Sequence, residues 1–172
     1  NNLGKLDSLP LLINYVRPLF PALVNSGIAL SQGDAAVNAP FARLGYDVGG
    51  EGVKIGVLSN SFNTQPGNKA QTDVLNEDLP GSGNIKNTHP VHVLNEYPYG
   101  VQSDEGRAML QIIHDIAPKA KLAFTTGFLS AGNMAKGIND LAEDSCDIIV
   151  DDITFITEPF LTDGVIAKTV NS

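Results

Sequence analysis

The stretch QSDEGRAMLQIIHDIAPKAKLAF, residues 102–124, has the pattern of an amphipathic helix that leads into a buried strand. Apolar side chains recur every four positions in it, which is the spacing of one face of a helix. They form two stripes, with Ala108, Ile112 and Ile116 on one and Met109, Ile113 and Ala117 on the next. Pro118 ends the helix, because proline lacks the N–H that a further turn needs. The pattern predicts one helix–strand unit of an α/β fold.

Similar units lie on both sides of this stretch. The predicted strands are VKIGVLS (53–59), VHVLNEY (91–97), KLAFTT (121–126) and CDIIVDDITF (146–155). The other predicted helices are 68–77, 130–145 and a last one that begins near Thr162 or Asp163 and runs to the end. Apolar strands that alternate with amphipathic helices build parallel sheets. We therefore expect a three-layer α/β fold whose parallel sheet is covered by helices on both faces, with its ligand site at the carboxyl ends of the strands.

The first part of the chain has a different pattern. Residues 8–46 are predicted to be helical, with prolines at the starts and breaks, so that residues 1–30 form a helical extension before an α/β domain at 31–172. The apolar segment LPLLINYVRPLFPALV (9–24) contains Arg17 and three prolines. It therefore predicts a short helix that packs on a neighbouring surface. No apolar run reaches the 18 residues of a membrane span.

Composition limits the possible partners. The chain has 172 residues, 42% hydrophobic, and a net charge of −8, with scattered lysines and arginines, which argues against a nucleic-acid surface. The single cysteine, Cys146, is expected to be a small core residue. The three histidines do not have metal-ligand spacing, and the GSG turn at 81–83 lacks the context of a phosphate loop. We expect neither a metal nor a cofactor.

Three segments, in order, resemble the amino-terminal half of subtilisin-like peptidases (subtilases) and of their relatives, the sedolisins. They are GEGVKIGVLSNSFN (50–63), DEGRAMLQIIHDIAPKAKLAF (104–124) and DLAEDSCDIIVDDITF (140–155). The resemblance covers residues 31–172 and implies a subtilisin-like architecture and a serine peptidase. It also implies a peptide or protein substrate, no cofactor, and a secreted or cell-envelope location.

The chain departs from the family pattern at each catalytic position. Ser59 and Asn60 stand where the strand-end aspartate is expected, and Glu105 stands at the position of the histidine. None of the ten serines lies in the nucleophile motif Gly-Thr-Ser-x-Ala. We therefore expect an incomplete catalytic domain that is inactive by itself. Its expected partners are the missing carboxyl-terminal fragment or a second copy of the chain.

Glu105 is the candidate general base, because the resemblance to sedolisins implies a glutamate in that role. The sedolisin position for the supporting aspartate is occupied by Met109, which leaves Asp104, Asn60, and Asp152 if the strand ends meet. An amide such as that of Asn60 can orient a carboxylate but cannot accept its proton. The alternative is a structural carboxylate, since an anion is favoured at the positive end of a helix.

The acidic pair Asp151 and Asp152, together with Gly127, is predicted by the resemblance to line a substrate cleft. Two alternatives stay open for the pair: a Mg²⁺ or Ca²⁺ site, or a solvated or helix-capping role. His114, beside Asp115, is expected to form a surface pair. Two rival functions also remain. One is a non-catalytic, peptidase-like binding module, and the other is a metal-dependent phosphate enzyme on a flavodoxin-like sheet.

Overall fold

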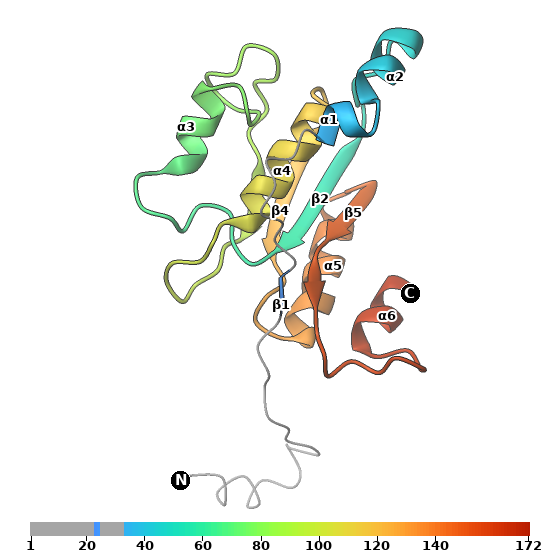
Figure 1. Ribbon diagram of the computed structural model, residues 1–172. Coiled ribbons are helices and arrows are strands. Elements are labelled where there is room, and N and C mark those ends of the chain that lie inside the picture. The colour runs from blue at the N-terminus through green and yellow to red at the C-terminus, as the bar shows by residue number, and fades with distance from the viewer. Residues whose placement is uncertain (1–22, 25–32) are drawn as a thin grey trace, which may run out of the picture.

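The computed structural model describes residues 23–24 and 33–172 (Figure 1). Within these residues the main sheet has four strands, in the order β3-β4-β2-β5, and all its strand pairs are parallel. The strands are β2 (Lys54–Ser59), β3 (His92–Asn95), β4 (Lys121–Thr126) and β5 (Ile148–Asp151). The helices that connect them are α3 (Lys69–Leu75), α4 (Glu105–Ile116) and α5 (Ala131–Glu143). The expected α/β fold with a parallel sheet is confirmed.

The register of the sheet aligns the carboxyl ends of its central strands. β2 pairs with β4 without a shift, from Lys54 opposite Lys121 to Ser59 opposite Thr126. On its other side β2 pairs with β5 as far as Leu58 opposite Asp151. The next residue along each strand is therefore Ser59 on β2 and Asp152 after β5. Polar residues from three strands thus reach the same edge of the sheet.

Helices cover both faces of the sheet, because successive side chains of a strand point to opposite faces. On one face, Val57 of β2 and Leu122 of β4 pack with Leu110 of α4. On the other face, Leu58 of β2 packs with Met134 of α5. The neighbouring residues Val57 and Leu58 are both fully buried, so the strand is apolar on its two sides.

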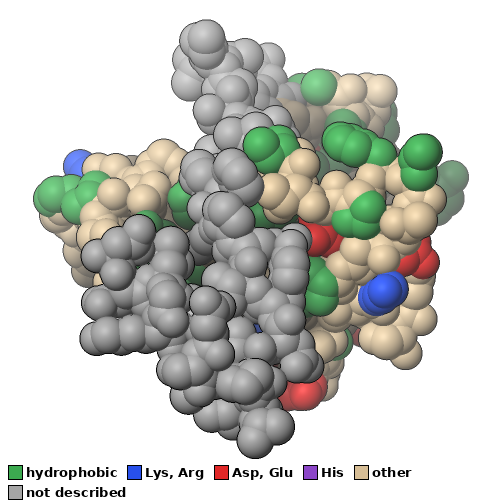
Figure 2. All heavy atoms as spheres, turned by 90° about the horizontal axis from the view of Figure 1, so that it is seen from below, with side chains coloured by type: hydrophobic (Ala, Val, Ile, Leu, Met, Phe, Trp, Pro, Cys, Tyr) green, Lys and Arg blue, Asp and Glu red, His purple; other side chains and the backbone are tan. Residues whose placement is uncertain are grey.

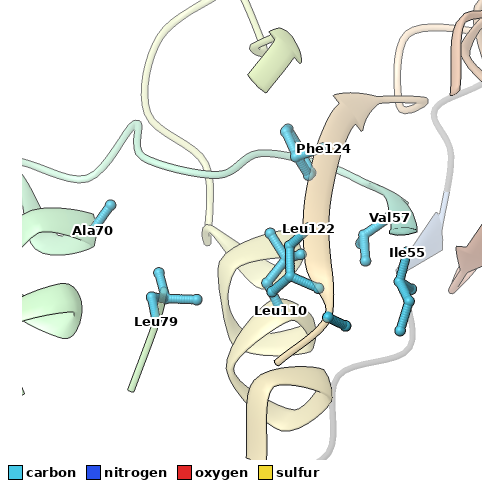
Figure 3. Packing of buried hydrophobic residues seen from close by; sticks show 8 residues of the cluster. Ile55, Val57, Ala70, Leu79, Leu110, Leu122 and Phe124 are labelled. Atoms are coloured by element: carbon cyan, nitrogen blue, oxygen red, sulfur yellow. The ribbon is translucent and has the colours of Figure 1, made fainter. Parts of the chain in front are cut away.

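Figure 3 shows the core under α4. Leu110 is directed toward Leu122, with Ile55 and Val57 of β2 on one side and Leu79 on the other. Removing a large side chain from such a packed site leaves a cavity and costs about 2–5 kcal/mol. This cluster holds α4 against the sheet and so places the start of the helix beside the strand ends.

The amino-terminal helical prediction is only partly right. Residues 33–46 contain α1 (Gly33–Ala36) and α2 (Ala39–Tyr46), as expected. Leu23–Val24, predicted to be helical, instead forms the strand β1. Extended pairing with another strand outweighs the local apolar pattern there. The rest of the predicted extension, residues 1–22 and 25–30, lies outside the described residues.

The predicted strand 146–155 is divided at Asp152. Its first part is β5, and its second part is the separate strand β6 (Ile153–Thr154), which pairs antiparallel with β1. The Asp151 carboxylate accepts a hydrogen bond from the Ile153 N–H at 3.3 Å, between the two strands. The last helix is α6 (Val165–Val170), close to where it was predicted.

His114 is a buried residue, and the expected surface pair with Asp115 is wrong. Its side chain lies under loop 79–87, where Asn84 Nδ2 donates to His114 Nε2 at 3.1 Å. The Asn84 orientation is set by its Oδ1, which accepts from Lys86 N–H at 2.8 Å. The proton of the neutral ring is therefore on Nδ1, an atom without a partner among the described residues. Residue 114 lies one helical turn from the apolar Leu110, so it belongs to the buried face.

Burial lowers the pKa of His114, and this predicts a loss of stability in acid. As the pH falls below about 6.5, the unfolded chain binds a proton that the folded chain resists. Relative to His114→Gln, which cannot titrate, the wild type should lose stability between pH 7 and pH 5. Urea unfolding of both proteins at several pH values measures this difference. Parallel pH profiles would contradict the prediction.

Candidate functional site

The candidate site lies at the carboxyl ends of β2, β4 and β5, where the start of α4 meets the sheet. Figure 2 looks at this end of the molecule, where hydrophobic side chains and a few acidic ones are visible among the described residues. Val57, Phe124 and Val150 belong to the apolar cluster under α4. Two residues further along each chain segment come Ser59, Thr126 and Asp152. By the alternation of side chains these three groups face α4 as well.

Gly106 lets the first turn of α4 approach the strand ends closely. A Cβ at this position would lie 2.3 Å from Phe124 Cε2 and 2.8 Å from the Ser61 carbonyl oxygen. Any side chain would therefore push the helix away from the sheet. Because Glu105 directly precedes this glycine, the close contact also brings the Glu105 side chain toward the strand ends.

Glu105 and Asp152 form a carboxyl pair. Their side chains share a hydrogen bond, and Glu105 Oε2 is buried without a partner among the described residues. Burial, then the hydrogen bond that protonated Glu105 donates to Asp152, then the negative charge of Asp152 raise the pKa of Glu105 from 4.5 to about 7. Two close carboxyl groups tend to share one proton, because both cannot ionise without repulsion. The pair can therefore exchange a proton near neutral pH.

Asn60 contacts Glu105 through the backbone. Its Oδ1 accepts a hydrogen bond from the Glu105 N–H at 3.2 Å, and its Nδ2 donates to Ser103 Oγ at 2.5 Å. Asn60 is buried, with 2% of its surface exposed. It thus satisfies an N–H group of the first turn of α4. The amide-to-carboxylate contact considered from the sequence is not among its hydrogen bonds.

Ser59 ends β2 and is fully buried. Its carbonyl oxygen accepts a hydrogen bond from Gly127 N–H at 3.1 Å, while its Oγ has no partner among the described residues. A serine that is fully enclosed cannot reach a substrate without movement of its surroundings. Its position suits a polar lining of the site better than a nucleophile.

The two other predicted cleft residues differ in their surroundings. Asp151 is exposed and hydrogen-bonds the Ile153 N–H. Gly127 is buried, and a Cβ there would lie 2.6 Å from Met134 Sδ and 3.2 Å from Ile153 Cδ1. Gly127 therefore allows the segment after β4 to pack closely on the segment after β5. The structure brings Asp152, and not Asp151, to Glu105.

A second strand lies next to this pair. β1 runs antiparallel to β6, with Leu23 opposite Thr154 and Val24 opposite Ile153. Ile153 directly follows Asp152, so the backbone pairing begins one residue from the carboxyl pair. The edge of β6 can accordingly hold an extended chain at this place.

An aromatic cluster beside the strand ends was not predicted. Tyr97, after β3, lies edge-on to Tyr99 at 5.8 Å between ring centroids and to Phe128 at 6.2 Å. Tyr99 is largely exposed. Aromatic residues directly after two strands, in EYPYG and TTGF, were the sequence signal for this surface. Such a surface suits apolar side chains of a ligand.

Within residues 33–172, no three side chains of His, Cys, Asp or Glu are grouped as a metal site would require. In the same residues no helix has the length and apolar character of a membrane span. Comparisons with family models, with curated proteins and with solved structures found no match.

Proposed function

We propose that this chain carries the general base of a serine-type peptidase site and that Glu105 is that base. The half-buried Glu105–Asp152 pair, in which Glu105 Oε2 is buried, is the observation that supports the proposal most. A group with a pKa near 7 can both accept and release a proton under physiological conditions, as a general base must. The sequence around Glu105, which resembles the catalytic helix of subtilases with the glutamate of sedolisins, supports the same role.

The proposed reaction proceeds through an acyl-enzyme. As a serine oxygen attacks the peptide carbonyl carbon, its proton passes to the Glu105 carboxylate. The C–N bond then breaks, and the amine leaves with that proton. Water next attacks the acyl carbon and gives its own proton to Glu105, which returns it to the released serine oxygen. Asp152 orients the base through their hydrogen bond. No serine of the sequence lies in the nucleophile motif of the family. The catalytic role that we propose for the described residues is therefore proton transfer.

A peptide substrate would bind in extended form along β6. The support for this is the pairing of β1 with β6, which uses the backbone groups that strand addition requires. The aromatic cluster of Tyr97, Tyr99 and Phe128 offers apolar contacts near the same strand ends. An uncharged, extended peptide with apolar side chains is the ligand that fits these surfaces best.

The second candidate is a peptide-binding module without catalysis. Ser59 and Asn60, which stand in place of the family aspartate, favour it. Asn60 is engaged with the Glu105 backbone and with Ser103, so neither atom of its amide supports the Glu105 carboxylate. In this case the cleft would hold a peptide while Glu105 remained a structural carboxyl group.

Cleavage and binding of unstructured apolar peptides distinguish these functions. Wild type and Glu105→Gln would be incubated with a peptide mixture from pH 4 to pH 8, with products identified by mass spectrometry. Glu143→Gln, which changes an exposed carboxylate on α5, is the matched control. Because the chain has no serine in the family motif, we expect it to be inactive by itself. With a partner that supplies the serine, cleavage should rise with pH through about 7, be lost in Glu105→Gln and be kept in Glu143→Gln.

Binding without cleavage even with that partner present, equal in all three proteins by fluorescence anisotropy, would support the binding module instead. Leu23→Pro/Val24→Pro removes two backbone N–H groups of β1. This variant should bind added peptide more tightly if β1 competes for the β6 edge. The absence of both cleavage and binding, in the wild type and in the proline variant, would overturn both candidate functions.

A further inference from the structure

Asp104, the residue directly before Glu105, is a buried carboxylate with several partners. Its Oδ1 accepts hydrogen bonds from Ser61 Oγ at 2.8 Å, Thr64 Oγ1 at 2.7 Å and Thr64 N–H at 2.8 Å. Its Oδ2 accepts from Gln65 N–H at 3.1 Å and from Arg107 Nη2 at 3.2 Å. All but Arg107 belong to loop 61–65, which follows β2. The carboxylate therefore joins this loop to the start of α4.

The conformation of Asp104 indicates that helix capping alone does not explain this residue. It stands at the N-cap of α4, yet its side chain makes no capping bond to the helix. Its backbone is left-handed, with φ at 56°, a conformation that costs a non-glycine residue about 1 kcal/mol or more. An aspartate placed only to stabilise the helix would point to its first N–H groups. Here the side chain turns to the loop, and Asn60 caps Glu105 instead.

The charge states of the two neighbouring acids differ. Burial of Asp104 opposes its ionisation, but the hydrogen bonds from Thr64, Gln65 and Ser61 outweigh burial, so the pKa of Asp104 lies below its ordinary value. Glu105, which faces Asp152, has a raised pKa. Asp104 thus stays an anion over the range in which Glu105 gains and loses its proton. Its hydrogen bonds persist through that change.

We propose that Asp104 is the positioning residue for Glu105: its carboxylate fastens loop 61–65 to the first turn of α4 and so holds the Glu105 side chain against Asp152. The importance of this for catalysis rests on the proposed function, whereas the positioning itself is a property of the fold. Arg107 extends the same connection to α3, because it also pairs with Asp73 and donates to the Phe62 carbonyl oxygen.

Two matched substitutions test the proposal. Asp104→Asn keeps the size and the tolerance for left-handed backbone, but it places an NH₂ group against the donors of Thr64 or Gln65. Asp73→Asn removes the other partner of Arg107 and leaves loop 61–65 and the start of α4 in place. The readout is the carbon-13 titration of the Glu105 side-chain carboxyl, a measurement that a general loss of stability does not move.

We expect the wild-type titration midpoint near 7 to fall by about one pH unit in Asp104→Asn, because a loosened Glu105 becomes hydrated and leaves Asp152. In Asp73→Asn the midpoint should stay within about 0.3 unit, even if the melting temperature of this variant falls as far as that of Asp104→Asn. An unchanged midpoint in Asp104→Asn would overturn the proposal. Should that variant fail to fold, Thr64→Val removes one donor to Asp104 and should move the midpoint in the same direction. No movement there would also count against the proposal.

Peptide cleavage separates this inference from the proposed function. A moved midpoint without cleavage by any variant, tested with the partner that supplies the serine, would keep the positioning role and reject the peptidase. Cleavage by the wild type, together with an unchanged midpoint in Asp104→Asn, would support the peptidase and reject the positioning role. If both hold, Asp104→Asn should lower kcat at least tenfold with little change in KM, since the peptide contacts β6 and not Asp104.

Discussion

Replacing Gly106 by alanine should destabilise the protein by about 3 kcal/mol, although alanine is the better helix former by about 1 kcal/mol. The new Cβ would lie 2.3 Å from Phe124 Cε2 and 2.8 Å from the Ser61 carbonyl oxygen. Neither neighbour can yield, since Phe124 is fully buried against Phe62 and Ser61 contributes backbone. The steric cost therefore exceeds the gain in helix propensity. Urea unfolding measures the difference.

Gly132→Ala is the control for this substitution. Gly132 lies in the first turn of α5, and the nearest atom to an added Cβ there is Ser130 Oγ at 3.8 Å. Alanine should stabilise the protein at this position, by up to about 1 kcal/mol. Equal stabilisation by both alanines would show that α4 does not approach the strand ends as closely as described. The Glu105 titration midpoint should also fall in Gly106→Ala, because the helix start is displaced from Asp152.

The second large effect is the loss of stability as Glu105 ionises. Its folded pKa, about 7, lies above the ordinary 4.5. Between these values the folded state binds more protons than the unfolded state, so stability decreases as the pH rises through that window. The protonated pair contributes fully below pH 4.5 and its contribution is lost by about pH 7. Because Glu105 is partly exposed, we expect about 2 kcal/mol rather than the full value of the shift.

Comparison with Glu105→Gln isolates this contribution. The glutamine cannot ionise, so the difference in unfolding free energy between the two proteins should shift in favour of the variant from pH 4.5 to pH 7. Asp152→Asn provides the second test, because it removes the neighbouring charge and should lower the Glu105 midpoint toward its ordinary value. A difference that does not depend on pH would contradict the described pair. Other groups, including His114, cancel because they are present in all three proteins.

Local patterns predicted the central elements well. Met109, Ile113 and Ala117 form one of the two apolar stripes predicted for α4, and all three pack on the cluster beneath it. Its other predicted stripe, with Ala108 and Ile112, is exposed. The pattern could not choose between the two stripes, because both are apolar. Leu110 and His114, which lie between them in sequence, complete the buried face.

The site depended on contacts between distant parts of the chain. The sequence identified Glu105 and Asp152 each as a candidate, but contact between their side chains was only one of several possible arrangements. The strand order β3-β4-β2-β5 and the register of β2 with β5 decide it, because they place Asp152 beside Ser59 under α4. Asp104, one residue before Glu105, is directed to loop 61–65 by the same packing.

The sequence by itself determined the α/β class, the limits of α4 and β4, and Glu105 as the residue to test, because each depends on neighbours within one or two turns of the chain. Only the tertiary structure decided that Asp152 is the partner of Glu105, that His114 is buried, and that Leu23–Val24 is a strand. Each of these depends on a residue at least 30 positions away. Hydrophobic periodicity records which side of an element is buried, but it carries no information about which element covers that side.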